Sequence, residues 1–401
     1  MRGRLLLATL LLVSLMAASA SAGPSRSPTV QDLQTLVAQH FERRREPEHL
    51  TGIGAYVSLG DPSPGVDLFV GNMRPEPTSP PISASTLYQI GSNTKAYTAA
   101  ILLKLEAAGL LSIDDKLGKW LPEYPAWKDV TIHRLLDMTG GIPEYTETTA
   151  FVTAIAANID RIFKPAELVA FAYPSTSNEL PPTPGYHYSN TGYILAGMIA
   201  EKAGQAHYGK LLEDLLLRPL GLADTFYGDR PQPHAVLSRL ISGHLYDPSC
   251  LEYEPECKTP PAQPLVGKDL SRAPMSWAGP AGAIIASPRD AAQWIRALFG
   301  GRVLPAKQMK EMQTLVSMRT GEPLAETNET ERQGFGLGIV QTFLPGYGRI
   351  WIYEGGTMGN RFYTVLNPSL DLVLTFGLDS AVSDEADKPG DLIKAVFDAA
   401  K

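Results

Sequence analysis

The chain has 401 residues, 44% of them hydrophobic and 19% charged, enough for a sizeable core in one large domain or two closely joined ones. Its formal net charge of -7 excludes nucleic acid as an expected partner, because such binding needs a basic surface. The seven histidines form no His-x-x-x-His pair or mixed His/Cys cluster. We therefore predict no metal site, and no cofactor.

The first 22 residues have the three-part pattern of a secretory signal peptide. Arg2 and Arg4 precede an apolar run, Leu5–Met16, and small residues follow at positions 17–22. The alternative is a membrane anchor, but the run is short for a bilayer span. We predict a signal peptide at 1–22 and a mature domain at 23–401, with no membrane span, located in the periplasm or secreted.

The next 200 residues begin with a helix and two strands and then become mainly helical. An amphipathic helix is predicted at 29–45, and strand-like runs lie at 52–59 and 66–70. Helical spacing of apolar residues is clearest at 131–138, 165–172 and 190–203.

Residues 227–274 are rich in proline and aromatics, and we predict an irregular excursion there. It contains the two cysteines, Cys250 and Cys257, which form a disulfide in an oxidising compartment or remain two free thiols.

The C-terminal part changes from helical to strand-like patterns. Helices are predicted at 287–299, 306–317 and 391–400. Three β-branched and aromatic runs, separated by turn residues, lie at 349–353, 361–366 and 370–376.

Strands at both ends of the chain and helices between them predict an α+β fold. The simplest packing is an antiparallel sheet built from both ends and flanked by helices, with a mainly helical lobe inserted in the middle. We place the α/β lobe at about 29–91 and 333–401 and the helical lobe at about 92–332. A cleft between the lobes is the natural place for a site.

A serine and a lysine one helical turn apart, Ser92 and Lys95, begin the long helical pattern after residue 90. A helix N-terminus offers unpaired N–H groups and partial positive charge, which suit a developing oxyanion. Burial disfavours a charged ammonium, so a lysine at a cleft floor can accept a proton from a hydroxyl. The plainer interpretation is a serine N-cap with a solvated lysine.

Two further segments strengthen the first interpretation. Tyr188 and Asn190 form a Tyr-x-Asn pair before another helical pattern, where the phenol can relay a proton and the amide can hold a substrate and contact Lys95. The Gly-rich segment Tyr353–Gly359 lets a backbone N–H approach a ligand closely.

In this order and spacing the three elements resemble the serine beta-lactamase and penicillin-binding-protein superfamily, with its Ser-x-x-Lys motif. The Tyr-x-Asn pair is similar to the branch of class C beta-lactamases, D,D-peptidases and family VIII esterases. Stretches similar to that branch are Gly109–Pro122, Val130–Pro143, Arg218–Leu222 and Gly334–Gly338. The resemblance covers about residues 30–400 and implies the beta-lactamase/transpeptidase-like fold and an acyl-enzyme on Ser92, with Lys95 and Tyr188 as its possible bases.

The third motif departs from that branch, which has Lys or His at its first position. In one register Tyr353, Glu354 and Gly355 form the motif and Gly356 supplies the oxyanion N–H. In the other, Glu354 is first and Thr357 supplies it. Neither provides a cation for a substrate carboxylate, although Arg361 lies close in sequence.

An exported serine hydrolase with an esterase- or D-amidase-like activity on a small ester, amide or peptide is therefore the leading hypothesis. The alternatives are a D-alanyl-D-alanine carboxypeptidase or penicillin-binding protein, a beta-lactamase, and, in another class, a non-catalytic ligand-binding homologue. Retention of Ser92, Lys95, Tyr188 and Asn190 argues against the last.

Overall fold

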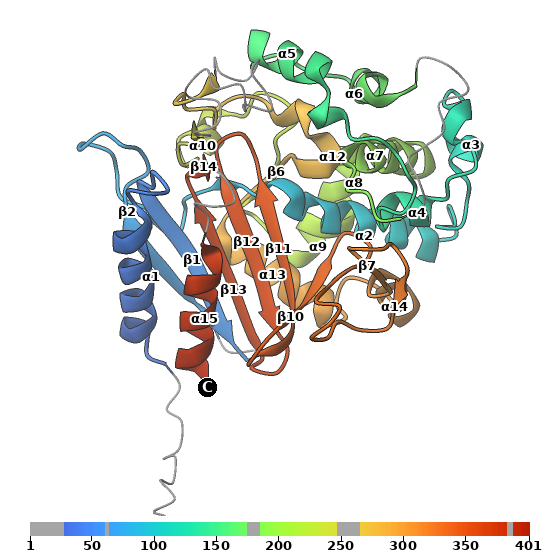
Figure 1. The fold of residues 1–401 in the computed structure, drawn as a ribbon. Coiled ribbons are helices and arrows are strands. Elements are labelled where there is room, and N and C mark those ends of the chain that lie inside the picture. The colour runs from blue at the N-terminus through green and yellow to red at the C-terminus, as the bar shows by residue number, and fades with distance from the viewer. Residues whose placement is uncertain (1–27, 61–63, 175–184, 247–264, 383–387) are drawn as a thin grey trace, which may run out of the picture.

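The computed structural model describes residues 28–60, 64–174, 185–246, 265–382 and 388–401 (Figure 1). The predicted signal peptide and the cysteines Cys250 and Cys257 lie outside these ranges. Helices account for 40% of the structure and strands for 21%.

A nine-stranded antiparallel sheet forms the framework, in the order β2-β1-β13-β12-β11-β10-β9-β7-β8 (Figure 1). Its strands are β1 (Gly52–Leu59), β2 (Val66–Gly71), β7 (Leu315–Ser317), β8 (Pro323–Leu324), β9 (Gln333–Phe335), β10 (Val340–Leu344), β11 (Gly348–Gly356), β12 (Arg361–Asn367) and β13 (Leu372–Leu378). The two chain ends meet where β1 pairs with β13, from Ile53 opposite Leu378 to Leu59 opposite Leu372. This confirms the predicted sheet.

Helices cover both faces of the sheet. On one face α1 (Val30–Arg44) and α15 (Pro389–Ala400) lie side by side (Figure 1), and their apolar residues share one core with β1 and β13. Thr29 caps the start of α1, because its hydroxyl accepts from the backbone N–H of Asp32 at 3.1 Å. On the other face α2 (Thr94–Ala107) and α13 (Pro288–Phe299) belong to the larger core.

The middle of the chain forms the helical region, packed against α2. Its helices are α3 (Leu117–Trp120), α4 (Ile132–Leu136), α5 (Thr149–Ala157), α6 (Pro165–Ala172), α7 (Asn190–Gly204), α8 (Tyr208–Leu212), α9 (Arg218–Leu220) and α12 (Gly279–Gly282). Helix α7 contacts α2, α4, α6 and α12, so it is packed from several sides.

Short strands connect the helical region to the sheet. One small sheet has the order β3 (Tyr88–Gln89), β6 (Ile284–Ala286), β4 (Thr225–Tyr227), and β5 (His244–Tyr246) pairs in parallel with β14 (Ser380–Val382). The described parts of the predicted excursion contain β5 and α10 (His234–Leu237).

The helix predicted at 306–317 is wrong in its second half. Helix α14 (Ala306–Met312) ends early, and Leu315–Ser317 form β7 instead. Leu315 and Val316 are suited to a buried strand, and pairing of Val316 with Phe335 adds β7 to the main sheet between β9 and β8. Helical spacing alone could not reveal that partner, which comes later in the chain.

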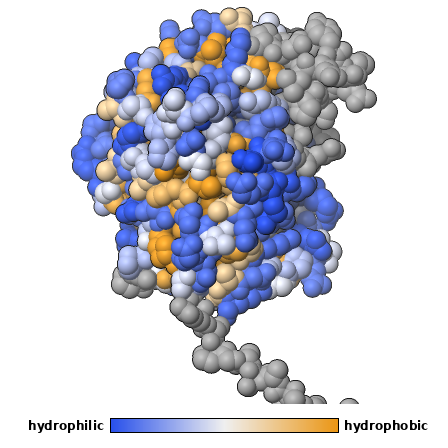
Figure 2. Space-filling view, turned by 90° about the vertical axis from the view of Figure 1, so that its left-hand side faces the viewer, coloured by the Kyte–Doolittle hydropathy of each residue, from blue (hydrophilic) through white to orange (hydrophobic). Residues whose placement is uncertain are grey.

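The face at the β2 edge mixes apolar and hydrophilic residues, as Figure 2 shows. Within the described ranges, no helix is long and apolar enough to cross a membrane. Those same ranges bring no three His, Cys, Asp or Glu side chains together in a way that could hold a metal ion.

Candidate active site

Ser92 lies in a tight turn, η1 (Gly91–Asn93), directly before α2. The side chain of Asn93 fixes this turn, because its Nδ2 donates to the carbonyls of Ile90 and Phe362, each at 3.0 Å. Gly91 has a φ of +51°, and a Cβ there would lie 2.5 Å from the carbonyl oxygen of Gly356. The turn is therefore pressed against the end of β11.

Lys95 lies one turn further along α2 and is completely buried. Its Nζ is 3.0 Å from Ser92 Oγ, 2.7 Å from Asn190 Oδ1 and 2.9 Å from the carbonyl oxygen of Ala281. An ammonium can donate to all three acceptors, whereas a neutral amine can donate to Asn190 and Ala281 and direct its lone pair at Ser92. The geometry accommodates both protonation states.

Tyr188 approaches Ser92 from the other side. Its hydroxyl is 2.6 Å from Ser92 Oγ, and Lys95 Nζ lies 4.8 Å from the centre of its ring. The side chain is 39% exposed, so this hydroxyl contact faces the solvent side of the site. Helix α7 starts two residues later, where the Ser189 hydroxyl caps it by accepting from the N–H of Gly192.

The third segment, β11, contributes alternate residues to opposite faces of the sheet. Tyr353 stands opposite Thr364 and packs with the core around α2. Its hydroxyl is buried, and burial together with the nearby tyrosines, Tyr188 among them, raises its pKa well above the usual range. Glu354 stands opposite Tyr363, which belongs to the core under α1 and α15, so it lies on the far face.

Gly355 is the point of closest approach between β11 and the serine turn. A Cβ there would lie only 1.9 Å from the carbonyl oxygen of Ile90 and 2.6 Å from Nδ2 of Asn93. At Gly356, by contrast, a Cβ would have no neighbouring atom within 4 Å. The strand end at Gly355 and Gly356 thus lies directly beside Ser92.

Arg361 does not supply a cation to the site. It is 3% exposed, its Nη2 lies 2.9 Å from Glu48 Oε2, and its Nε donates to the Ser380 carbonyl at 2.8 Å. Tyr186 has a structural role: its hydroxyl donates to Met138 Sδ at 3.4 Å and its ring packs against Phe335.

Two contributors were missed from the sequence. The first is the backbone carbonyl of Ala281 in α12, which no residue type identifies in advance. The second is Glu144, whose Oε2 accepts from the N–H of Asn190 and whose Oε1 accepts from the N–H and hydroxyl of Thr146, at 2.8 and 2.7 Å. The sequence shows an acidic residue directly after Ile142 and Pro143. It does not show that this residue lies next to the Tyr-x-Asn pair, because the fold brings the two together.

A serine, a buried lysine and a tyrosine in mutual contact, on an antiparallel sheet with a helical region, define a class of serine hydrolases. The beta-lactamase family model matches residues 54–396, and the chain therefore belongs to the beta-lactamase family, within the beta-lactamase and penicillin-binding-protein superfamily.

Relatives of known structure or name agree with this assignment. Penicillin-binding protein 4* of Bacillus subtilis is 32% identical over 171 residues, which are 42% of this chain and 36% of that protein. Protein flp of Staphylococcus aureus is 26% identical over 275 residues, 65% of this chain and 50% of that protein. The chain thus spans half or less of the length of these curated relatives.

Solved structures match over almost the whole chain. A D-stereospecific amidohydrolase from Streptomyces sp. is 26% identical with a TM-score of 0.73, covering 92% of this chain and 99% of that one. The D-amino acid amidase of Ochrobactrum anthropi complexed with D-phenylalanine has a TM-score of 0.74 at 22% identity, covering 92% of this chain and 98% of that one, which shows the shared fold.

Proposed function

We propose that this protein is an exported serine hydrolase that forms an acyl-enzyme on Ser92 and acts on esters or D-amino-acid amides. The observation that carries the proposal is the pair of contacts at Ser92 Oγ, 3.0 Å from Lys95 Nζ and 2.6 Å from the Tyr188 hydroxyl. A nucleophile within hydrogen-bonding distance of two possible bases is the arrangement that acyl transfer requires.

In the first half of the proposed reaction, Ser92 Oγ attacks the substrate carbonyl carbon and its proton leaves through Lys95 or Tyr188. The N–H groups of Ser92 and Gly356 stabilise the oxyanion. The bond to the leaving alcohol or amine then breaks, and the leaving group takes that proton. In the second half, water attacks the acyl-enzyme, the acid is released and Ser92 regains its proton.

We assign the two bases by the contacts around Lys95. As a neutral amine, Lys95 accepts the Ser92 proton directly while Asn190 and Ala281 hold its two N–H groups. As an ammonium, it stabilises a Tyr188 phenolate that takes the proton instead. Exchange of Lys95→Arg, which keeps the charge but cannot act as a base, separates the two routes: activity survives only on the second.

Neither register of the third motif supplies a cation, and the described Arg361 is paired elsewhere, which supports an uncharged group at that position of the substrate. We propose the register in which Tyr353 is first, because Gly355 packs against Ile90 and Glu354 lies on the far face of the sheet. The Tyr353 hydroxyl is buried and uncharged, and Arg361 is already paired with Glu48. An ester or a simple amide meets that requirement, and the D-stereospecific amidohydrolase and D-amino acid amidase neighbours support it.

A D-alanyl-D-alanine carboxypeptidase or penicillin-binding activity is the second candidate, favoured by the similarity to penicillin-binding protein 4*. Beta-lactamase activity, which uses the same acyl-enzyme chemistry, is the third candidate. The signal-like residues 1–22 support export to the periplasm or beyond the cell. The substrate is a small molecule, and we propose neither a nucleic-acid partner nor a cofactor.

The test is intact mass of the purified mature protein after incubation with benzylpenicillin, with the drug monitored in the same tube, beside turnover assays with short acyl esters and D-amino-acid amides. We expect hydrolysis of the esters or amides that is lost in Ser92→Ala. Unchanged turnover in Ser92→Ala would refute the acyl-enzyme mechanism. A stable penicillin adduct on Ser92 would move the penicillin-binding function ahead.

A further inference from the structure

Glu144 places a negative charge beside the start of α7, where Asn190 lies. Its carboxylate is partly buried and accepts three hydrogen bonds, from the backbone of Asn190 and from the N–H and hydroxyl of Thr146. All three donors are neutral, and no ion pair to Glu144 exists within the described part of the chain. A carboxylate offers about four lone-pair positions, so one acceptor position remains for a ligand.

Short contacts connect this carboxylate to the nucleophile. Glu144 binds the N–H of Asn190, the Asn190 side chain binds Lys95 at 2.7 Å, and Lys95 is 3.0 Å from Ser92 Oγ. The buried Tyr145 hydroxyl lies near both Glu144 and Tyr188, and after burial itself these two neighbours are the causes that raise its pKa well above the usual range.

A partly desolvated carboxylate whose partners are all neutral attracts a cation more strongly than an exposed one does, because water screens it less. The acyl-enzyme hypothesis puts the acyl group of the substrate beside Asn190 and Lys95. A positive group on that acyl portion, one or two bonds from the reacting carbonyl, is then the natural partner of this carboxylate. The α-ammonium of an amino acid has this charge and position, and a charge-assisted bond to it would be strong.

We propose that Glu144 is a substrate-binding residue that takes the α-ammonium of an aminoacyl amide or ester, so that the substrates are amino-acid derivatives with a free amine. This inference rests on the proposed acylation of Ser92. The competing role is structural: Glu144 caps the η3 turn (Tyr145–Glu147) and holds the start of α7. The structural role predicts equal damage to every substrate, whereas ammonium recognition predicts damage to free-amine substrates alone.

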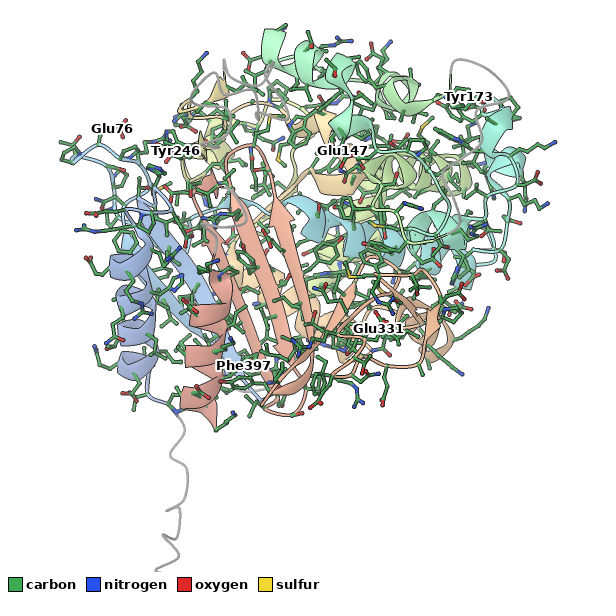
Figure 3. The ribbon with its side chains drawn as sticks, viewed as in Figure 1. Glu76, Glu147, Tyr173, Tyr246, Glu331 and Phe397 are labelled. Atoms are coloured by element: carbon green, nitrogen blue, oxygen red, sulfur yellow. The ribbon has the colours of Figure 1, made fainter. Side chains whose placement is uncertain are left out.

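The experiment compares kcat/KM for D-phenylalanine amide and for N-acetyl-D-phenylalanine amide, which lacks the charge. Glu144→Gln is expected to lower kcat/KM for the free amine at least about tenfold, the effect of losing one charge-assisted contact, and to change the N-acetyl substrate less than about threefold. The matched control is Glu147→Gln, three residues on, whose exposed side chain is labelled in Figure 3 and which should change neither value.

A measurement on the unaltered protein guards against misfolding of the variant. An α-amino group loses its proton at about pH 7.7–8.0, so the preference for the free amine should fall through that range while the N-acetyl rate does not follow it. Glu144→Asp, which keeps the charge, should retain the preference.

Equal losses on both substrates in Glu144→Gln, a loss reproduced by Glu147→Gln, or a wild-type enzyme with no preference for the free amine would each overturn the assignment. Ser92→Ala separates the two levels of inference. If Ser92→Ala is inactive and Glu144→Gln shows no selectivity, ammonium recognition fails while the acyl-enzyme stands. If Ser92→Ala stays active on both amides, the proposed function itself fails.

Discussion

Gly355→Ala should disable the site by a steric effect that the structure allows to be sized. The added methyl would start 1.9 Å from the Ile90 carbonyl oxygen, whereas real Cβ contacts are essentially never shorter than 3.0 Å. The serine turn and β11 must therefore move apart by about 1.1 Å, the difference between those two distances. A displacement of about 1 Å between reacting groups costs on the order of 100-fold in rate.

Overpacking of this kind also costs about 1–3 kcal/mol of stability. Both neighbours of the new methyl, the Ile90 carbonyl and the Asn93 amide, are part of the turn that holds Ser92, so relief by moving a flexible side chain is limited. We expect Gly355→Ala to lose roughly 100-fold in kcat on an activated acyl ester. Its thermal midpoint should fall as well.

The control is the adjacent glycine. Gly356→Ala introduces the same methyl where no atom lies within 4 Å, so its thermal midpoint should match that of the wild type. The assays are ester hydrolysis at saturating substrate and thermal unfolding by circular dichroism. Gly355→Ala with wild-type kcat and stability would show that β11 is not pressed against the serine turn, and the steric reasoning would be wrong.

Three other predictions concern the rest of the molecule. Burial lowers the pKa of His40 from 6.5 to about 4, so as the pH falls the unfolded chain binds a proton at His40 before the folded protein does. The free energy of unfolding therefore falls as pH drops from 6.5 towards 4, by about 2–3 kcal/mol between pH 7 and 4.5. Urea unfolding of His40→Leu should show most of this pH dependence lost. Glu48→Gln leaves the buried Arg361 without its anion and should cost about 3–5 kcal/mol in the same assay, and a wild-type midpoint would contradict a buried ion pair. Tyr188→Phe should lower kcat by about 100-fold or more without changing the fold seen by circular dichroism, and full activity would remove Tyr188 from the proton path.

Local patterns in the sequence predicted most elements because each pattern lies within one element. The strands around 52–59 and the helix at 165–172 have the bounds of β1 and α6. The segment 315–317 failed because its strand character depends on a partner, β9, that lies further along the chain.

The candidate site shows the same division between local and distant information. Ser92 and Lys95 could be paired from their spacing on one helix, and the structure places them 3.0 Å apart. Glu144 has no such spacing relative to Asn190, and the carbonyl of Ala281 has no side chain to identify it. Sequence reasoning finds contacts within an element more readily than contacts made by packing between elements.

Packing between two helices therefore determines the surroundings of the buried lysine. A Cβ on Gly197 of α7 would lie 2.2 Å from Cγ of Pro280 in α12, so these helices approach as closely as a glycine allows. That approach brings Asn190, at the start of α7, and the carbonyl of Ala281, next to Pro280, to the same Nζ of Lys95. A larger residue at 197 would separate the two acceptors and leave a fully buried amine with a lost partner, although position 197 touches no reacting atom. The hydrogen bonds of the proposed base thus depend on helix spacing as much as on the motif that contains it.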